Sequence, residues 1–166
     1  MKTNDNRQNA HNEIDRIFKV LLPTRNMAER PEQAALCHRM LDAMVEGGIA
    51  LCDAGTGIGK TYAYLVAGTV YSRFRAACGL ERKPILVSTS SIALQTAARD
   101  EYLPLLSDVL TEDGMIVQPL RAVIRKGKSH YVCDARLEQR LGQLDLQKKN
   151  WKAGAALLSL RGQLDM

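Results

Sequence analysis

The sequence is organised around the stretch Ala54-Gly55-Thr56-Gly57-Ile58-Gly59-Lys60-Thr61. It matches the phosphate-loop pattern in a relaxed form, with Ala54 where a glycine is usual. An apolar run, 48–53, leads into it and a helix-prone run, 61–67, leads out. A strand, a glycine-rich turn and a helix in this order favour nucleoside triphosphate binding over the alternative, an ordinary turn with an exposed lysine.

The residue types in this loop suit a polyphosphate anion. Glycines let the backbone approach phosphate oxygens closely, and successive N–H groups with the helix N-terminus face the anion. Lys60 is placed for the β- and γ-phosphates and the Thr61 hydroxyl for Mg²⁺. We therefore expect the nucleotide to contact the whole loop, Ala54, Gly55, Thr56, Gly57, Ile58, Gly59, Lys60 and Thr61.

Length and composition indicate one globular domain. The chain has 166 residues, 46% hydrophobic and 25% charged, with a net charge of +5 that mildly favours polyanions. No apolar run approaches the ~20 residues of a transmembrane helix, so no membrane association is expected. The polar start, 1–12, resembles no targeting signal and is expected to be a flexible tail, which points to a cytoplasmic protein.

Apolar periodicity predicts an α/β fold. Strands are expected at 49–53, 85–88 and 120–124, and the first two, joined by a helix over 60–74, form a parallel βαβ unit. Further helices are predicted at 13–22, from Pro31 to Gly47, from Ser90 or Ser91 through Ala98 with a break or kink at Pro104, and over most of 134–163.

Three more segments stand in order around the loop. They are Arg30-Pro31-Glu32-Gln33, Ser88-Thr89-Ser90-Ser91-Ile92-Ala93-Leu94-Gln95, and Arg125-Lys126-Gly127-Lys128-Ser129-His130-Tyr131-Val132-Cys133. With the loop, they make residues 30–137 resemble the N-terminal part of superfamily 2 DNA helicases of the DinG/XPD type. Lys128 and His130 stand where that family has Arg and Asn, so the turn keeps its basic character, while the family's local hydrogen bonding does not carry over to it as given.

The resemblance implies a RecA-like parallel-sheet domain that couples ATP hydrolysis to movement on single-stranded DNA. It implies that Gln33, with Arg30, reads the adenine edge, that Lys60 and Thr61 serve catalysis, and that Cys133 is the first ligand of an iron–sulfur cluster. It implies DNA contacts from Ser88, Thr89, Ser90, Gln95, Arg125, Lys126 and Lys128. Each assignment has an alternative. Gln33 is then a solvated glutamine and the serines of 88–91 only cap a helix. The basic residues of 125–128 then form a solvated turn, and Cys133 is a free thiol.

Two sets of groups are missing from this pattern. A four-cysteine cluster is not complete, because no cysteine follows Cys133 and the other three, Cys37, Cys52 and Cys78, belong to the nucleotide-domain pattern. Hydrolysis also needs a carboxylate and an arginine, and no apolar strand ending in Asp-Glu occurs.

The chain is therefore expected to be a helicase fragment that is inactive and self-associating on its own. Its expected parts are a tail (1–12), an incomplete ATP-binding domain (13–125) and the start of an iron–sulfur, mostly helical insertion (126–166). A stand-alone nucleotide-binding module is the alternative. Another phosphate-loop ATPase is a third reading, which leaves the segments at 30–33 and 88–95 unexplained.

Overall fold

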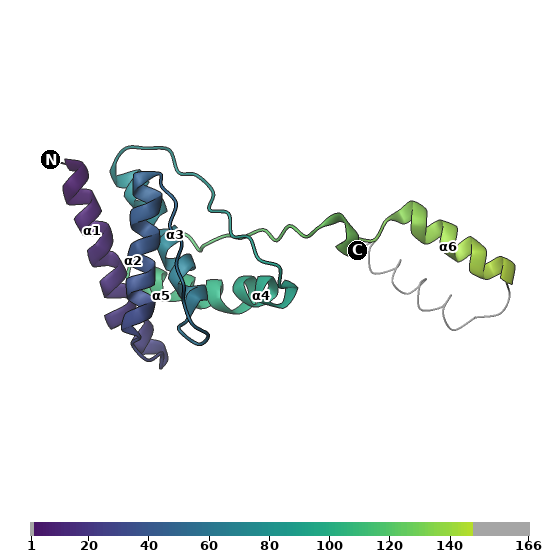
Figure 1. Cartoon of the computed structure of the whole chain (residues 1–166), viewed down its shortest axis with the longest axis horizontal. Helices are drawn as coiled ribbons and strands as arrows, with labels where there is room; N and C mark the ends of the chain where they lie inside the picture. The colour runs from purple at the N-terminus through teal and green to yellow at the C-terminus, as the bar shows by residue number, and fades with distance from the viewer. Residues whose placement is uncertain (1, 148–166) are drawn as a thin grey trace. The chain divides into compact units, whose positions relative to one another are not determined.

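The computed structural model describes residues 2–147, and all regular structure in that range is helical (Figure 1). In chain order the elements are α1 (Lys2–Arg16), the π-helix η1 (Ile17–Leu21), the 3-10 helix η2 (Leu22–Arg25), α2 (Pro31–Glu46), α3 (Lys60–Ala77), α4 (Ile92–Ala97), the π-helix η3 (Ala98–Tyr102), α5 (Leu103–Glu112), the 3-10 helix η4 (Lys128–His130) and α6 (Asp134–Gln147). The chain divides into two compact units, the first ending at Ile124 and the second beginning at Arg125.

The predicted α/β, parallel-sheet, RecA-like fold is wrong for the described residues, because no strand occurs between residues 2 and 147. The segments 49–53, 85–88 and 120–124 are irregular instead. A strand is stabilised by ladder hydrogen bonds to a neighbour and by burial of its apolar side chains. Ile49, Leu51 and Leu86 are 95%, 97% and 94% exposed, so apolar composition here is not accompanied by burial.

Within the described residues, the helices that periodicity predicted are confirmed. α2 begins at Pro31 after extended Arg30, since proline is compatible with the first helical turn. It ends at Gly47, whose φ of 68° is left-handed and whose N–H donates to the Ala43 carbonyl. α3 begins at Lys60 and runs beyond the predicted end near residue 74, to Ala77.

The core of the first unit lies between helices. α2 packs against α3, and α1 packs on both (Figure 1). The inward-facing residues recur at helical spacing, which buries one apolar stripe from each helix. Fully or nearly fully buried members are Ile14, Ile17 and Phe18 from α1 and η1, Cys37 and Leu41 from α2, Ala63, Val66 and Val70 from α3, and Leu106 and Leu110 from α5.

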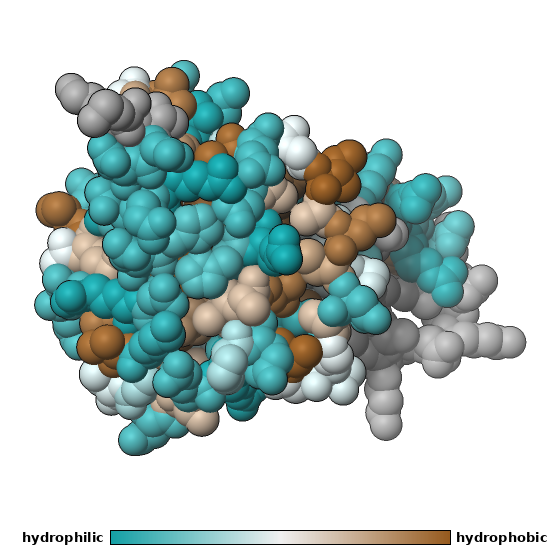
Figure 2. Space-filling model, turned by 60° about the vertical axis from the view of Figure 1, so that its left-hand side comes forward, coloured by the Kyte–Doolittle hydropathy of each residue, from teal (hydrophilic) through white to brown (hydrophobic). Residues whose placement is uncertain are grey.

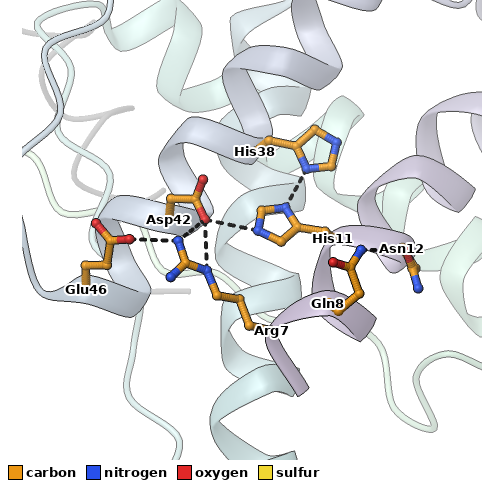
Figure 3. Close-up of polar contacts among 7 residues, drawn as sticks. All are labelled: Arg7, Gln8, His11, Asn12, His38, Asp42 and Glu46. Carbon is orange, nitrogen blue, oxygen red and sulfur yellow. Dashed lines mark hydrogen bonds and ion pairs between the residues drawn. The ribbon is translucent and has the colours of Figure 1, made fainter. Parts of the chain in front are cut away.

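Residues 2–12, expected to belong to a flexible tail, form most of α1 instead. Ala10 is buried, and Arg7 binds α2 through the carboxylates of Asp42 (Nη2–Oδ1 2.6 Å) and Glu46 (Nη2–Oε1 2.7 Å) (Figure 3). Burial opposes ionisation of Asp42, but hydrogen bonds and charge from Arg7 and His11 outweigh it and hold the pKa of this carboxyl below its usual value. The polar composition of residues 2–12 thus suits an interface between two helices.

Two histidines join the same interface. The ring nitrogens Nδ1 of His11 and His38 lie 2.8 Å apart, and Nε2 of His11 lies 3.0 Å from Oδ1 of Asp42 (Figure 3). One of the two Nδ1 atoms must carry a proton and donate the hydrogen bond, and the other must accept that hydrogen bond. This cluster binds α1 to α2 through polar contacts above the buried core.

α1 is also bound to later parts of the first unit. Arg73 in α3 donates to both carboxylate oxygens of Glu13, at 2.7 and 2.9 Å, and to the Met115 carbonyl. A bidentate arginine–carboxylate pair fixes orientation as well as distance. One side chain of α3 therefore connects α1 with the segment that follows α5.

α4, η3 and α5 form one continuous run over residues 92–112. Its start at Ile92 is capped by Ser91, one of the two serines predicted for this role, whose Oγ accepts from the Leu94 N–H at 3.2 Å. Pro104 lies in the first turn of α5. In a regular α-helix its ring would clash with the carbonyl of Asp100, and the wider π turn η3 spans that position.

The second unit contains η4 and α6. The Lys126 N–H donates to the Tyr131 hydroxyl at 3.1 Å, which closes the turn around η4. Cys133 precedes α6, and its carbonyl accepts from the Leu137 N–H at 2.9 Å. The helix predicted from residue 134 is confirmed as far as Gln147, and the rest of the prediction, to residue 163, lies outside the described residues.

On the face that Figure 2 shows, most of the surface is hydrophilic and hydrophobic side chains are interspersed. Within residues 2–147, none of the helices combines the length and the apolar character needed to cross a bilayer.

Candidate nucleotide site

The glycine-rich loop connects an extended segment to the first turn of α3. Gly57 and Gly59 have φ values of 86° and 90°, a left-handed conformation that glycine adopts without steric cost. Gly59 immediately precedes Lys60, the first residue of α3. The first N–H groups of a helix lack partners within the helix and face an anion at its N-terminus. The backbone of the loop therefore fits a phosphate group.

Two side chains at the start of α2 donate hydrogen bonds to backbone carbonyls of the loop. Arg30 donates from Nη1 to the carbonyl oxygen of Gly57. Gln33 donates from Nε2 to the carbonyl oxygen of Gly59, with an N–O distance of 2.7 Å. The structure thus brings together the loop and the Arg30–Gln33 segment, which the sequence had assigned to one nucleotide site.

Lys60 extends back over the loop. Its Nζ donates to the carbonyl oxygens of Ala54 and Gly55, at 2.9 and 2.6 Å. The side chain is exposed, so an anion in the loop can replace either carbonyl as its partner. Thr61, the candidate ligand for Mg²⁺, follows in the first turn of α3 and is partly exposed.

The predicted DNA segment, 88–95, consists of a turn and the capped first residues of α4. Ser88 and Ser90 are exposed. Thr89 is turned toward the segment itself, where its Oγ accepts from the Ser91 N–H at 3.2 Å and its carbonyl accepts from Gln95 Nε2 at 3.3 Å. The other amide atom of Gln95, Oε1, is buried without a partner among the described residues.

The remaining predicted DNA residues, Arg125, Lys126 and Lys128, are exposed in the second unit around η4. They are concentrated in a stretch of four residues. Such a stretch offers several cations to a phosphate backbone without selecting a sequence.

The cysteines differ in burial, and those among the described residues form no cluster with other candidate ligands. Cys37 is buried in α2, and burial raises the pKa of its thiol. Cys133 is exposed in the second unit, and it is the only cysteine after residue 124 in the sequence. Within residues 2–147, no group of three or more His, Cys, Asp or Glu side chains is arranged to hold a metal ion.

Sequence reasoning missed the cluster that His11, His38 and Asp42 form between α1 and α2. The two histidines are separated by 27 positions, and no spacing motif connects them. The apolar periodicity of residues 31–46 predicted that one face of this helix packs on a core. It gave no indication that the N-terminal segment packs against the same helix.

Comparison with protein-family models gave no match, and no solved structure was found to be similar. Several curated proteins do match. The chain is 32% identical over 131 residues to the 3'-5' exonuclease DinG of Bacillus subtilis, 34% over 110 residues to the ATP-dependent DNA helicase YoaA of Escherichia coli, and 37% over 110 residues to the ATP-dependent helicase DinG of Mycobacterium tuberculosis. These matches cover 79%, 66% and 66% of this chain but 13%, 15% and 15% of the relatives, so the chain spans a small part of their length. The resemblance to DinG-type helicases is confirmed.

Proposed function

We propose that this chain is the nucleotide-binding part of an ATP-dependent DNA helicase of the DinG type. The observation that carries the proposal is the phosphate loop at the start of α3, held by Arg30 and Gln33 and covered by Lys60. The similarity to proteins named ATP-dependent helicases supports ATP as the nucleotide and DNA as the polymer.

In this proposal each group of the loop has a defined task. The backbone N–H groups at the start of α3 bind phosphate oxygens, and the Lys60 ammonium moves from the loop carbonyls to the β- and γ-phosphates. The Thr61 hydroxyl is the group that would hold Mg²⁺, which neutralises charge on the phosphates when bound. The adenine-edge assignment of Arg30 and Gln33 stays a prediction.

The DNA contacts belong to two exposed sets of side chains. Ser88 and Ser90 offer hydroxyl groups, and the basic stretch around η4 offers cations. We propose that both bind the phosphate backbone of single-stranded DNA, with Thr89 and Gln95 shaping the turn that presents the serines. Such binding weakens with rising salt because counterions are released.

The proposal is tested by substituting Lys60. Lys60→Ala removes the ammonium group, so we expect binding of a fluorescent ATP analogue with Mg²⁺ to weaken at least about tenfold, since a charge-assisted hydrogen bond contributes about 1.5–3 kcal/mol. Lys83→Ala is the matched control, because Lys83 is exposed in an irregular segment outside the loop. Equal affinity of the Lys60→Ala protein and the unaltered chain would refute the assignment of the site.

In the whole protein we expect ATP hydrolysis to depend on single-stranded DNA and to be lost in Lys60→Ala. Steady-state phosphate release with and without an oligonucleotide measures both properties. Hydrolysis that is indifferent to DNA would contradict the helicase proposal while leaving nucleotide binding in place.

A further inference from the structure

A chain of polar contacts crosses the interface between α1 and α2 and includes both histidines of the first unit (Figure 3). Nε2 of His11 lies 3.0 Å from Oδ1 of Asp42, and Nδ1 of His11 lies 2.8 Å from Nδ1 of His38. Nε2 of His38 continues the chain to Oδ1 of Asp15, at 3.5 Å. The two imidazoles thus lie between two carboxylates, one on each helix.

These contacts determine how many protons the two rings hold. A carboxylate accepts hydrogen bonds, so each Nε2 atom must carry a proton to donate. The Nδ1–Nδ1 contact needs one proton, since two protons would face each other and none would leave two acceptors in contact. A neutral imidazole carries one N–H, so all three contacts are made when the pair holds three protons and shares one positive charge.

The charged groups around the rings come from both sides of the interface. They are Asp5, Arg7, Asp15 and Lys19 from α1 and η1, and Asp42 and Glu46 from α2. Carboxylates outnumber cations in this set, which favours a proton on the rings. The hydrogen bond from Lys19 lowers the pKa of Asp15 and, against the effect of burial, contacts with Arg7 and His11 lower the pKa of Asp42. Above about pH 5 these two carboxylates therefore stay ionised while histidine titrates.

The two halves of α1 are held differently. In the C-terminal half, Ile14 is fully buried and Glu13 accepts two hydrogen bonds from Arg73 of α3. Among residues 4–12, Ala10 alone is buried, and attachment to α2 is polar, through Arg7 and His11. Loss of the ring contacts therefore loosens the N-terminal half of α1 while the core keeps the C-terminal half in place.

We propose that His11 and His38 form a pH-sensitive latch, which holds the N-terminal half of α1 on α2 while the rings share one positive charge and releases it when both rings are charged. The ring of His11 lines an open polar pocket, so protons reach it from solvent without opening of the core. The latch does not depend on the proposed nucleotide binding.

Proton counting gives the direction of the pH dependence. An ordinary histidine titrates near about pH 6.5, so two released rings hold four protons well below that pH and two well above it. The latched pair holds three, so release takes up a proton in acid and gives one up in alkali, and the latch is most stable near about pH 6.5. The acid side is steeper, because two Nδ1–H groups repel each other, whereas the loss of a proton in alkali weakens only the long contact with Asp15.

Hydrogen exchange of the 166-residue chain from about pH 5 to about pH 8, corrected for the intrinsic exchange rate, tests the latch. We expect the protection of residues 4–12 to peak near about pH 6.5 and to fall by up to about tenfold per pH unit on the acid side, since release takes up one proton. Peptides of α3 that contain Val66 and Val70, both fully buried, are the internal reference and should show no such peak.

His11→Gln and His38→Gln each remove the shared proton, and either change should abolish the peak. The two substitutions lie on different helices, so one remains if the other prevents folding. His130→Gln is the matched control, because His130 is exposed in the second unit, and this variant should keep the profile of the unaltered chain. Nitrogen-15 spectra of the rings give an independent measurement: at the pH of greatest protection we expect one protonated and one unprotonated Nδ1.

A flat profile for residues 4–12, or one that falls only in step with α3, would overturn the proposal. A peak that persists in a folded glutamine variant at position 11 or 38 would overturn it as well. Two protonated Nδ1 atoms in a chain whose residues 4–12 stay protected would show that the shared proton is not what holds the helix.

Discussion

Gly59→Ala and Gly57→Ala form a matched pair, because both glycines have a left-handed φ but only a Cβ atom added at Gly59 would meet another side chain. Alanine in this conformation costs about 1–2 kcal/mol at either position. At Gly59 the new Cβ would lie 2.1 Å from Gln33 Nε2 and must displace that buried amide. Leaving its partner unsatisfied adds about 1–3 kcal/mol. We therefore expect destabilisation of about 2–5 kcal/mol for Gly59→Ala and about 1–2 kcal/mol for Gly57→Ala.

Urea unfolding followed by circular dichroism measures the difference. The double variant Gly59→Ala/Gln33→Ala is the decisive control, since removal of the Gln33 side chain opens space for the new methyl group. We expect the double variant to lose less stability than the sum of the two single changes, which indicates coupling between contacting residues. Equal unfolding free energies for the two glycine variants, or strict additivity in the double variant, would refute the close contact between Gly59 and the Gln33 side chain.

Three further outcomes are expected. Asp42→Asn should destabilise the chain by about 1–2 kcal/mol near neutral pH, because it weakens the contacts with Arg7 and His11. Since the folded-state pKa of Asp42 lies below its usual value, the difference in stability from the unaltered chain should close as the pH falls through that pKa. A difference in urea midpoints that stays constant across pH would contradict this expectation. Cys52 and Cys133 should react quickly with a thiol reagent while Cys37 reacts only on unfolding, because burial raises the pKa of Cys37 and blocks access; one rapid phase for all thiols would count against the core assignment. The chain should self-associate through its exposed apolar segments, so a compact monomer at all concentrations in size-exclusion chromatography would oppose that expectation.

Apart from residues 2–12 of α1, the helices were predictable from the sequence because their hydrogen bonds are local. The apolar spacing at 14, 17, 18 and 21, the cap before residue 92 and the start of α3 at Lys60 all depend on residues within a few positions of one another. A strand depends on a distant partner, and β-branched, apolar composition at 49–53 or 85–88 carries no information about whether that partner is present. The sheet prediction failed for this reason.

The candidate site divides in the same way. The loop and Lys60 are contiguous, and their arrangement follows from glycine conformation and the start of a helix. The contact between Gln33 and Gly59 spans 26 positions and depends on how α2 packs against α3, so sequence order alone could place the two segments near one site but could not show which atoms meet.

The π turn η3 sets the helical phase of everything that follows it. Successive residues of an α-helix are rotated by about 100° around the axis, so removing one residue from 98–102 would turn the apolar stripe of α5 through about that angle relative to α4. Leu106 and Leu110, which are fully buried, would then leave the core or pull α4 out of place. The length of this run is therefore constrained more tightly than its composition, and side-chain replacements in η3 should be tolerated where a single deletion is not.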